Sequence, residues 1–204
     1  MPKRNPESYE ARRQQIIDGA LRVFSTKGFL AATNKDVAEA AGINSPALIY
    51  HYFDSKEDLL RAVVEIHAAP MKLLTQTDSL MAMPPAQVLT LFGRAFLDMM
   101  EDPKMTACMR VLIGEAMRSP EFAEILGNAG VLRIRRLLAD YIQHQMDEGV
   151  LRAMDPLVAA HCFMGPFQTY AMMRIILRLP GSPPIDPESL VAAQVDIFLR
   201  ALQV

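Results

Sequence analysis

Apolar residues recur along almost the whole chain at spacings of three and four, which is the period of a helix with one buried face. Ile16, Ile17, Ala20, Leu21 and Phe24 form one such face, and the same spacing returns in later segments. The chain has no run of about four to eight alternating β-branched residues, which would indicate a strand. The pattern predicts an all-α protein.

Helix boundaries are marked by capping residues and by glycines, of which Gly28, Gly42, Gly149 and Gly181 stand where helices should end. Six times a capping residue stands directly before proline, as at Ser45-Pro46 and Asp155-Pro156, where the side-chain oxygen can accept from free amides of the first turn. These signals predict about nine helices, over residues 6–27, 34–41, 46–53, 56–80, 85–101, 103–118, 120–148, 156–179 and 187–203. Pro70 and Pro166 fall inside two of them, and each should kink or break its helix.

Composition narrows the class of protein. With 51% hydrophobic and 22% charged residues among 204, the chain is too apolar to be disordered. No apolar stretch reaches the ~18 uncharged residues that a membrane span needs, and charged residues stand where a signal peptide would place its apolar run. We therefore expect a soluble, cytoplasmic protein with no membrane partner.

Charge is distributed unevenly around a net value of −2. Residues 1–35 hold seven Lys or Arg against three acidic residues, whereas the rest of the chain holds 14 basic and 20 acidic residues. A basic end on an acidic body is typical of a protein that meets an anionic partner at one end.

Residues 33–56 have the layout of two short helices around a tight turn. The first helix ends at Gly42, the turn contains Ile43 and Asn44, and the second helix starts at Ser45. In a helix-turn-helix of this kind the second helix enters the DNA major groove, and about eight residues give about 12 Å, close to the groove width. Its aromatic residues could equally be packing residues of a simple helical hairpin, so the geometry leaves both interpretations open.

The chain resembles the TetR family of transcriptional regulators over about residues 12–62. The matching positions are Thr33, Asp36, Val37, Ala38, Ala41-Gly42-Ile43, Ser45, Ile49-Tyr50, Tyr52-Phe53 and Ser55-Lys56-Glu57, with Ile16, Ala20, Phe24 and Gly28-Phe29 upstream. The later helices resemble the family's body in layout only. The resemblance implies a homodimer that binds a palindromic, double-stranded operator and is released by a small-molecule effector.

Carried over by position, the resemblance implies a set of DNA contacts, mostly to phosphates. These are Thr33, Lys35, Asn44, Ser45, Pro46, Ala47, Tyr50, His51, Tyr52 and Lys56. Two departures leave the base-reading residue open: Asn44 makes the turn one residue longer than is common, and Ala47 replaces a frequent glycine. We predict appreciable readout of DNA shape or of thymine methyl groups.

The helices predicted over residues 156–179 and 187–203 are apolar on more than one side. A helix of that kind must be covered on both sides, and at the edge of a small domain the second cover is naturally another subunit. The expected interface residues are Met164, Met172, Ile175, Leu179, Val195, Phe198 and Leu202. The alternative is an internal hairpin in a monomer.

The body is rich in methionine and aromatic residues, whose adaptable side chains suggest a pocket for an apolar or aromatic effector. Ordinary core packing is the alternative for each residue taken singly. The candidate ligand-binding residues are His67, Phe92, Phe96, Met99, Met109, Met117, Phe163, Phe167 and Tyr170.

These predictions divide the chain into a DNA-binding domain over residues 1–55 and a ligand-binding and dimerisation domain over residues 56–204. An effector would move the fourth helix and so change the separation of the two DNA-binding domains. We expect no enzyme, because no nucleophile–base set or metal-binding spacing occurs, and therefore no cofactor or metal. A helix-turn-helix protein that acts through protein contacts, without operator binding, stays open as an alternative.

Overall fold

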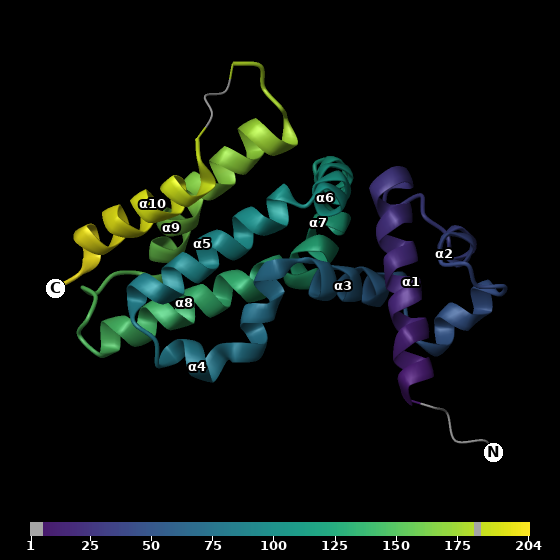
Figure 1. Cartoon of the computed structure of the whole chain (residues 1–204), viewed down its shortest axis with the longest axis horizontal. Coiled ribbons are helices and arrows are strands. Elements are labelled where there is room, and N and C mark those ends of the chain that lie inside the picture. The colour runs from purple at the N-terminus through teal and green to yellow at the C-terminus, as the bar shows by residue number, and fades with distance from the viewer. Residues whose placement is uncertain (1–5, 182–184) are drawn as a thin grey trace. The chain divides into compact units, whose positions relative to one another are not determined.

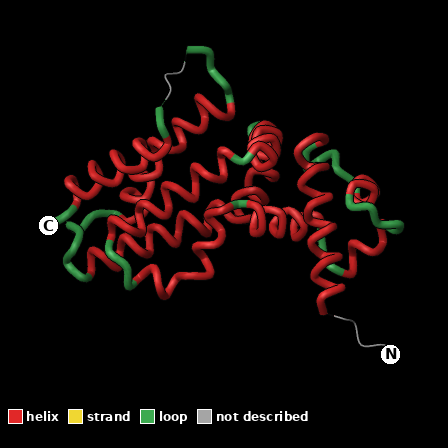
Figure 2. Tube along the Cα trace, viewed as in Figure 1, coloured by secondary structure: helices red, strands yellow, loops and turns green. Residues whose placement is uncertain are grey.

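A computed structural model of the chain describes residues 6–181 and 185–204. Within these residues it consists of helices and turns, with a single isolated β-bridge between Leu151 and Gln203 (Figure 2). The prediction of an all-α fold is confirmed. No helix in the described part of the chain has both the length and the apolar character needed to cross a membrane.

Contacts divide the chain into two compact units, Met1–His67 with Pro103–Gly130 and Ala68–Asp102 with Val131–Val204. The first unit contains α1 (Pro6–Lys27), α2 (Asn34–Ala40), the 3₁₀ helix η1 (Pro46–His51), α3 (Lys56–His67), α6 (Pro103–Ala116) and α7 (Pro120–Leu126). The second contains the 3₁₀ helix η2 (Ala69–Gln76), α4 (Thr77–Met81), α5 (Pro85–Glu101), α8 (Leu132–Asp147), α9 (Pro156–Tyr170), the π-type segment η4 (Ala171–Ile176) and α10 (Pro187–Leu202). The predicted boundary after residue 55 concerns function rather than packing, and it stays a prediction.

In the first unit, α1 packs against α2, α3 and α6 (Figure 1). Its buried face is the predicted one, and Ile16, Ile17 and Phe24 have no exposed surface. Gly19 allows the end of α2 to approach closely, because a Cβ at this position would lie 2.8 Å from the Cβ of Ala41. Helix α1 is therefore the support on which the shorter helices of this unit rest.

In the second unit, α5 packs against α10, and α8 packs against α9. The core between them is aromatic: Phe163 lies edge-on to Phe167 and to Phe198, with ring centroids 5.4 and 5.2 Å apart. The hydroxyl of Tyr141 donates to the carbonyl oxygen of Met83 at 2.8 Å. Burial raises the pKa of Tyr141 to about 12, so this hydroxyl keeps its proton and its hydrogen bond at neutral pH.

The predicted helix boundaries hold at most positions and fail at three. The helix expected over residues 56–80 ends at His67, and η2 and α4 follow it, as the proline at position 70 led us to expect. The helix expected over residues 120–148 is interrupted by a π-type segment, η3 (Gly127–Val131), in which Gly130 has non-helical dihedral angles. The helix expected over residues 156–179 ends at Tyr170 and is followed by the π-type segment η4, whereas the break expected at Pro166 is wrong, because α9 continues through this proline.

A glutamine on α10 compensates for the proline inside α9. Because Pro166 has no N–H, the carbonyl of Cys162, four residues earlier, has no donor within the helix. The side-chain amide of Gln194 donates to the carbonyl oxygens of Cys162 and Phe163, at 3.3 and 3.1 Å. A side chain from the neighbouring helix thus replaces the backbone bond that the proline removes.

Replacing Gln194 by leucine, which has a similar size and no donor, is expected to lower the free energy of unfolding by about 1 kcal/mol. Urea denaturation of the parent chain, Gln194→Leu, Pro166→Ala and the double variant measures the coupling between the two positions. With alanine at position 166 the helix can supply its own donor, so the glutamine should matter less. Strictly additive losses would contradict this explanation.

Candidate nucleic-acid interface

The turn between α2 and η1 is closed by backbone hydrogen bonds. Helix α2 begins with a reciprocal cap, in which Thr33 Oγ1 accepts from Asp36 N at 3.2 Å and an Asp36 carboxylate oxygen accepts from Thr33 N at 3.0 Å. At its other end Gly42 adopts a φ of +66°, and Ile43 N donates to the carbonyl of Ala38 at 2.9 Å. The side chain of Ile43, just before η1, is buried.

The predicted second helix of the motif forms, but as a six-residue 3₁₀ helix rather than an α-helix. In a 3₁₀ helix, side chains three residues apart lie on one ridge. Ile49 is on the inner ridge and 2% exposed, whereas Ala47 and Tyr50 share an outer ridge and Tyr50 is 64% exposed. At about 2.0 Å per residue, six residues still span about 12 Å, so the helix keeps the expected reach across a major groove.

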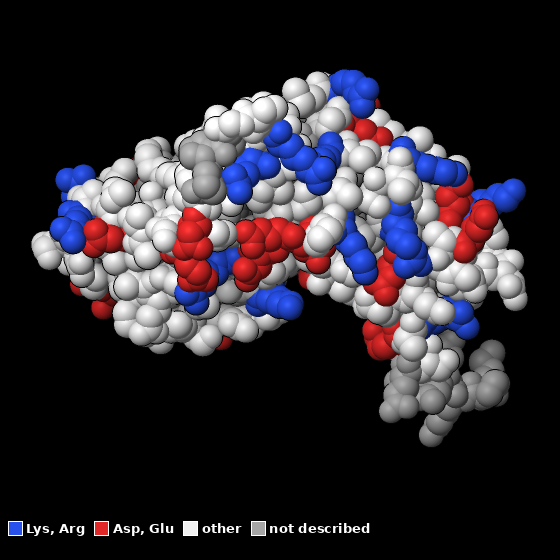
Figure 3. Space-filling view, turned by 45° about the horizontal axis from the view of Figure 1, so that its top comes forward, with Lys and Arg blue, Asp and Glu red and all other residues white. Residues whose placement is uncertain are grey.

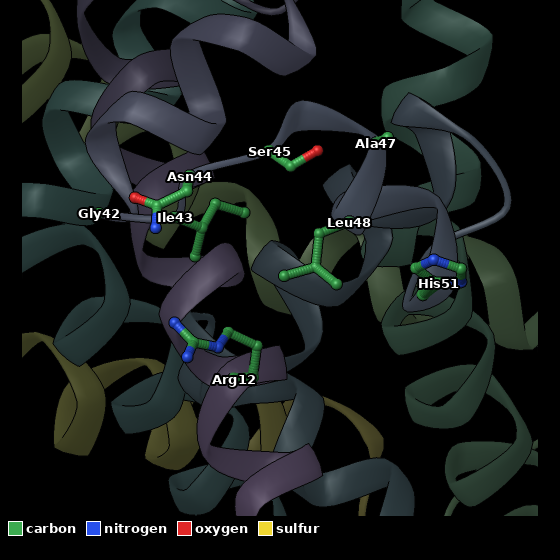
Figure 4. A pocket seen from close by; sticks show the side chains of 8 residues that line it. All are labelled: Arg12, Gly42, Ile43, Asn44, Ser45, Ala47, Leu48 and His51. Carbon is green, nitrogen blue, oxygen red and sulfur yellow. The ribbon is translucent and has the colours of Figure 1, made fainter.

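An open hollow of about 410 Å³ lies beside this helix (Figure 4). It is lined by Arg12 of α1 and by Gly42, Ile43, Asn44, Ser45, Ala47, Leu48 and His51. Ile43 and Leu48 provide apolar walls, while a guanidinium, an amide, a hydroxyl and an imidazole provide polar groups that can bind phosphate oxygens. Sequence reasoning missed Arg12, because it lies outside the motif; the excess of basic residues near the N-terminus was the only signal for it.

Eight of the ten predicted DNA contacts lie largely exposed on this motif and its flanks. They are Thr33, Lys35, Asn44, Ser45, Pro46, Ala47, Tyr50 and His51. Over the helices of this unit, the face in Figure 3 carries basic and acidic side chains next to one another. The basic groups on this face are thus interspersed with acidic ones and do not form a continuous patch.

The other two predicted contacts, Tyr52 and Lys56, are half-buried. The ring of Tyr52 stacks on that of Tyr9 in α1, with centroids 4.6 Å apart. The ammonium of Lys56 donates to the carbonyl oxygens of Phe29 and Leu30, at 2.8 and 3.3 Å, and to a third carbonyl two residues further along. A phosphate contact by Lys56 would require these bonds to be exchanged.

Asp36 carries the clearest electrostatic perturbation in the motif. Lys27 of α1 donates to its carboxylate at 2.5 Å, and this bond, followed by the bonds from Thr33, lowers the pKa of Asp36 from 3.8 to about 2. The charged carboxylate thus joins the end of α1 to the start of α2.

Because the folded pKa of Asp36 lies below its unfolded value, the unfolded chain binds the proton more tightly. We expect the stabilisation by Asp36 to be complete above about pH 5 and to be lost as the pH falls through 3.8 towards 2. Thermal unfolding of the parent chain and of Asp36→Asn between pH 6 and 2.5 tests this. The difference in Tm should shrink as the pH falls, and a constant difference would contradict the assignment.

The structure brings together some of the predicted ligand-binding residues and separates others. Phe92, Phe163 and Phe167 are buried in the core of the second unit, with Phe96 and Tyr170 packed against it. Met99 is half-buried in α5 of the same unit.

The remaining three candidates for the ligand pocket belong to the first unit. Met117 is 83% exposed just after α6, and Met109 is half-buried within α6. His67 Nε2 lies 3.2 Å from a carboxylate oxygen of Asp18. The nine candidates therefore do not form one cluster within either unit.

The predicted interface residues also fall into two groups. Met164, Met172, Ile175 and Leu179 are half-buried or exposed along α9, η4 and the turn that follows. Val195, Phe198 and Leu202 are at most 8% exposed, because the apolar stripe of α10 faces the core of its own unit. On α10 and the two residues that follow it, the large apolar side chains exposed to solvent are Ile197, at 61%, and Val204, at 87%.

Among the described residues no three His, Cys, Asp or Glu side chains lie close enough together to hold a metal ion. Cys108 is buried, which raises the pKa of its thiol to about 12, so it behaves as a small apolar residue.

Two family models match the chain. Residues 16–63 match the model for bacterial regulatory proteins of the tetR family, and residues 87–204 match the C-terminal domain of AefR-like transcriptional repressors. The first range contains the motif and parts of the flanking helices α1 and α3, and the second begins within α5 and runs to residue 204.

Individual proteins give the same result. The HTH-type transcriptional regulator BetI of Rhizobium meliloti is 34% identical over 147 residues, which is 70% of this chain and 67% of that protein. The crystal structure of a TetR-family regulator from Mesorhizobium loti superposes with a TM-score of 0.70 at 22% identity, over 96% of this chain and 98% of the other. The flavonoid-responsive regulator FrrA is 26% identical, with a TM-score of 0.63 over 95% and 98% of the two chains.

Proposed function

The chain belongs to the TetR family of DNA-binding transcriptional regulators, and on that premise we propose that it is a homodimeric repressor of a palindromic operator. A small apolar or aromatic effector releases it. Regulators of this family are transcription factors and not enzymes, so membership of the family means that the chain is not an enzyme.

The observation that carries the proposal is the exposed outer ridge of η1 beside the polar hollow. Ala47 and Tyr50 project from the ridge, and Arg12, Ser45 and His51 surround the hollow. Cationic and hydroxyl groups are suited to bind phosphate oxygens, and a methyl group with an aromatic ring is suited to contact thymine methyls. We assign phosphate binding to the hollow and the readout of bases or groove shape to the ridge.

The homodimer is proposed on the outward face of α9, η4 and α10. Val158, Met172, Met173 and Ile197 are large apolar side chains that are 39 to 61% exposed there. Four helices, two from each copy, would cover these side chains. The dimer would then hold two copies of the α2–η1 motif, one for each of two half-sites about one helical turn apart. Relative to the sequence-based interface, Ile197 takes the place of the buried Val195, Phe198 and Leu202.

The proposed effector is apolar or aromatic for two reasons. The predicted pocket residues are phenylalanine, methionine and tyrosine, which suit planar and apolar molecules. FrrA, one of the similar structures, is described as flavonoid-responsive. In this proposal the effector favours an arrangement in which the two α2–η1 motifs are separated by a different distance. Each tenfold loss of operator affinity requires about 1.4 kcal/mol of coupling free energy between effector binding and DNA binding.

Selection of bound duplexes from a random pool, with and without planar aromatic and apolar compounds, tests the proposal. We expect an enriched palindrome, whose enrichment at least one compound abolishes. A chain that binds no duplex even in dilute salt would contradict the proposal and favour a helix-turn-helix that acts through protein contacts.

Tyr50→Ala removes the largest exposed side chain of the ridge, so it should weaken binding of the enriched duplex about tenfold or more. Fluorescence anisotropy measures the affinity, and sedimentation should show an unchanged oligomeric state. Thr75→Ala, exposed on η2, is the matched control and should bind like the parent chain. Equal affinity of Tyr50→Ala and the parent would remove the ridge from the interface.

A further inference from the structure

The first unit contains a buried carboxylate that the proposed DNA contacts do not use. Glu115 of α6 is 8% exposed and accepts hydrogen bonds from two backbone amides in the loop after α1. Its oxygens lie 2.8 Å from Phe29 N and 3.1 Å from Leu30 N. Burying a charge is costly unless it is paired or hydrogen-bonded, so these two bonds are what make the position tolerable.

The same two residues are held from their carbonyl side by Lys56, the first residue of α3. Its ammonium donates to the carbonyl oxygens of Phe29, Leu30 and Ala32 and lies 4.6 Å from the centroid of the Phe29 ring. The N–H groups of this short segment are thus bound by an anion from α6, and its C=O groups by a cation from α3. We call this arrangement the Glu115–Lys56 clamp.

The local sequence is adapted to the clamp. A Cβ on Gly28 would lie 2.3 Å from an oxygen of Glu115, so only glycine lets the carboxylate approach the backbone here, and its φ of +84° also requires glycine. Phe29 is 2% exposed and stacks on Phe122 of α7, with centroids 5.0 Å apart. The segment is therefore fixed by packing as well as by charge.

The clamped segment leads directly into the DNA-binding motif. Only Ala31 and Ala32 separate Leu30 from Thr33, the N-cap of α2, and α2 is joined to η1 by the turn at Gly42. The position of the Phe29 and Leu30 peptides therefore sets where α2 begins and how η1 is presented.

We propose that Glu115 and Lys56 are positioning residues for DNA binding, which act on η1 through the Phe29–Leu30 segment and do not contact DNA. The inference rests on the proposed function and adds a regulatory input to it. Helices α3 and α6 converge on the same two peptide groups. A movement of either helix would therefore displace the segment that leads into α2 and η1.

Glu115→Gln tests the anionic half of the clamp. The variant keeps the size of the side chain but replaces one acceptor oxygen by an NH₂ group, which cannot accept from a backbone amide. Hydrogen exchange at the amides of Phe29 and Leu30 should quicken, and the affinity for the selected duplex should fall about tenfold. The slope of log Kd against log salt should stay unchanged, because no phosphate contact is lost.

Lys56→Met tests the cationic half, with the same expected result. Lys35→Ala is the comparison for a residue proposed to bind phosphate, and it should lower the salt slope by about one. Leu112→Ala, which opens a cavity at a buried position of α6, is the matched control for lost stability. It should lower the Tm and leave the affinity of the folded protein within twofold of the parent.

Two DNA-binding results would overturn the clamp. One is Glu115→Gln binding within twofold of the parent, and the other is Lys56→Met lowering the salt slope as Lys35→Ala does, which would make Lys56 a phosphate ligand. If the parent chain bound no duplex, the proposed function would fail instead. Exchange rates at Phe29 and Leu30 that Glu115→Gln left unchanged would even then overturn the clamp.

Discussion

Ile197→Glu is expected to convert the protein to a monomer and to weaken operator binding by about a hundredfold or more. Ile197 is 61% exposed on α10, so the substitution should not disturb the fold of its own unit. In the proposed dimer its side chain is covered by the second copy, and an unpaired carboxylate buried there is strongly unfavourable. A monomer then binds one half-site at a time and loses the gain of two linked contacts, about 10²–10⁴ in affinity.

Sedimentation velocity and anisotropy with the selected duplex measure the two effects on one sample. Gln87→Glu, an exposed position on α5, adds the same charge elsewhere in the second unit and should leave both properties unchanged. Circular dichroism should show the same helix content in both variants. A dimeric Ile197→Glu that still binds the duplex would exclude this face of α10 as the interface.

Phe163→Ala is expected to lower the free energy of unfolding by about 3–5 kcal/mol. The side chain of Phe163 is fully buried, between the rings of Phe167 and Phe198. Truncation removes its apolar contacts and leaves a cavity that the two neighbouring rings can only partly fill, since each is held by its own helix.

Urea denaturation followed by circular dichroism measures the loss. Met173→Ala removes a flexible side chain that is 45% exposed in η4, and it should cost less than about 1 kcal/mol. The same pair also tests the role of Phe163 in the predicted ligand pocket. If Phe163→Ala were as stable as Met173→Ala, the ring would not be part of a packed core, and its assignment to an effector pocket would gain support.

The capping pattern predicted much of the fold. Side chains of Ser119, Asp155 and Asp186 accept from free amides of the following first turn, as the residue-before-proline pattern implied. The glycines predicted to end helices, Gly28, Gly42, Gly149 and Gly181, all adopt a positive φ. These features could be found because a cap is a local interaction between residues at most a few positions apart.

Features that depend on distant contacts could not be predicted. An apolar stripe such as that of Val195 and Phe198 has the same period whether it faces its own core or a second subunit. Ser45 was expected to cap an α-helix, but it makes no side-chain cap bond and a 3₁₀ helix forms instead. The contact between Glu115 and Phe29 joins residues 86 positions apart, and no sequence spacing indicates it.

The stacked rings of Tyr9 and Tyr52 have a practical consequence for work with shortened versions of this protein. Tyr9 lies in the first turn and a half of α1, a place where trimming or tagging is often assumed to be harmless. Its ring nevertheless stacks on that of Tyr52, the residue that directly follows η1. A version that begins after this tyrosine would lack the ring on which Tyr52 stacks, so a loss of DNA affinity in such a version would not by itself identify a DNA contact among the removed residues.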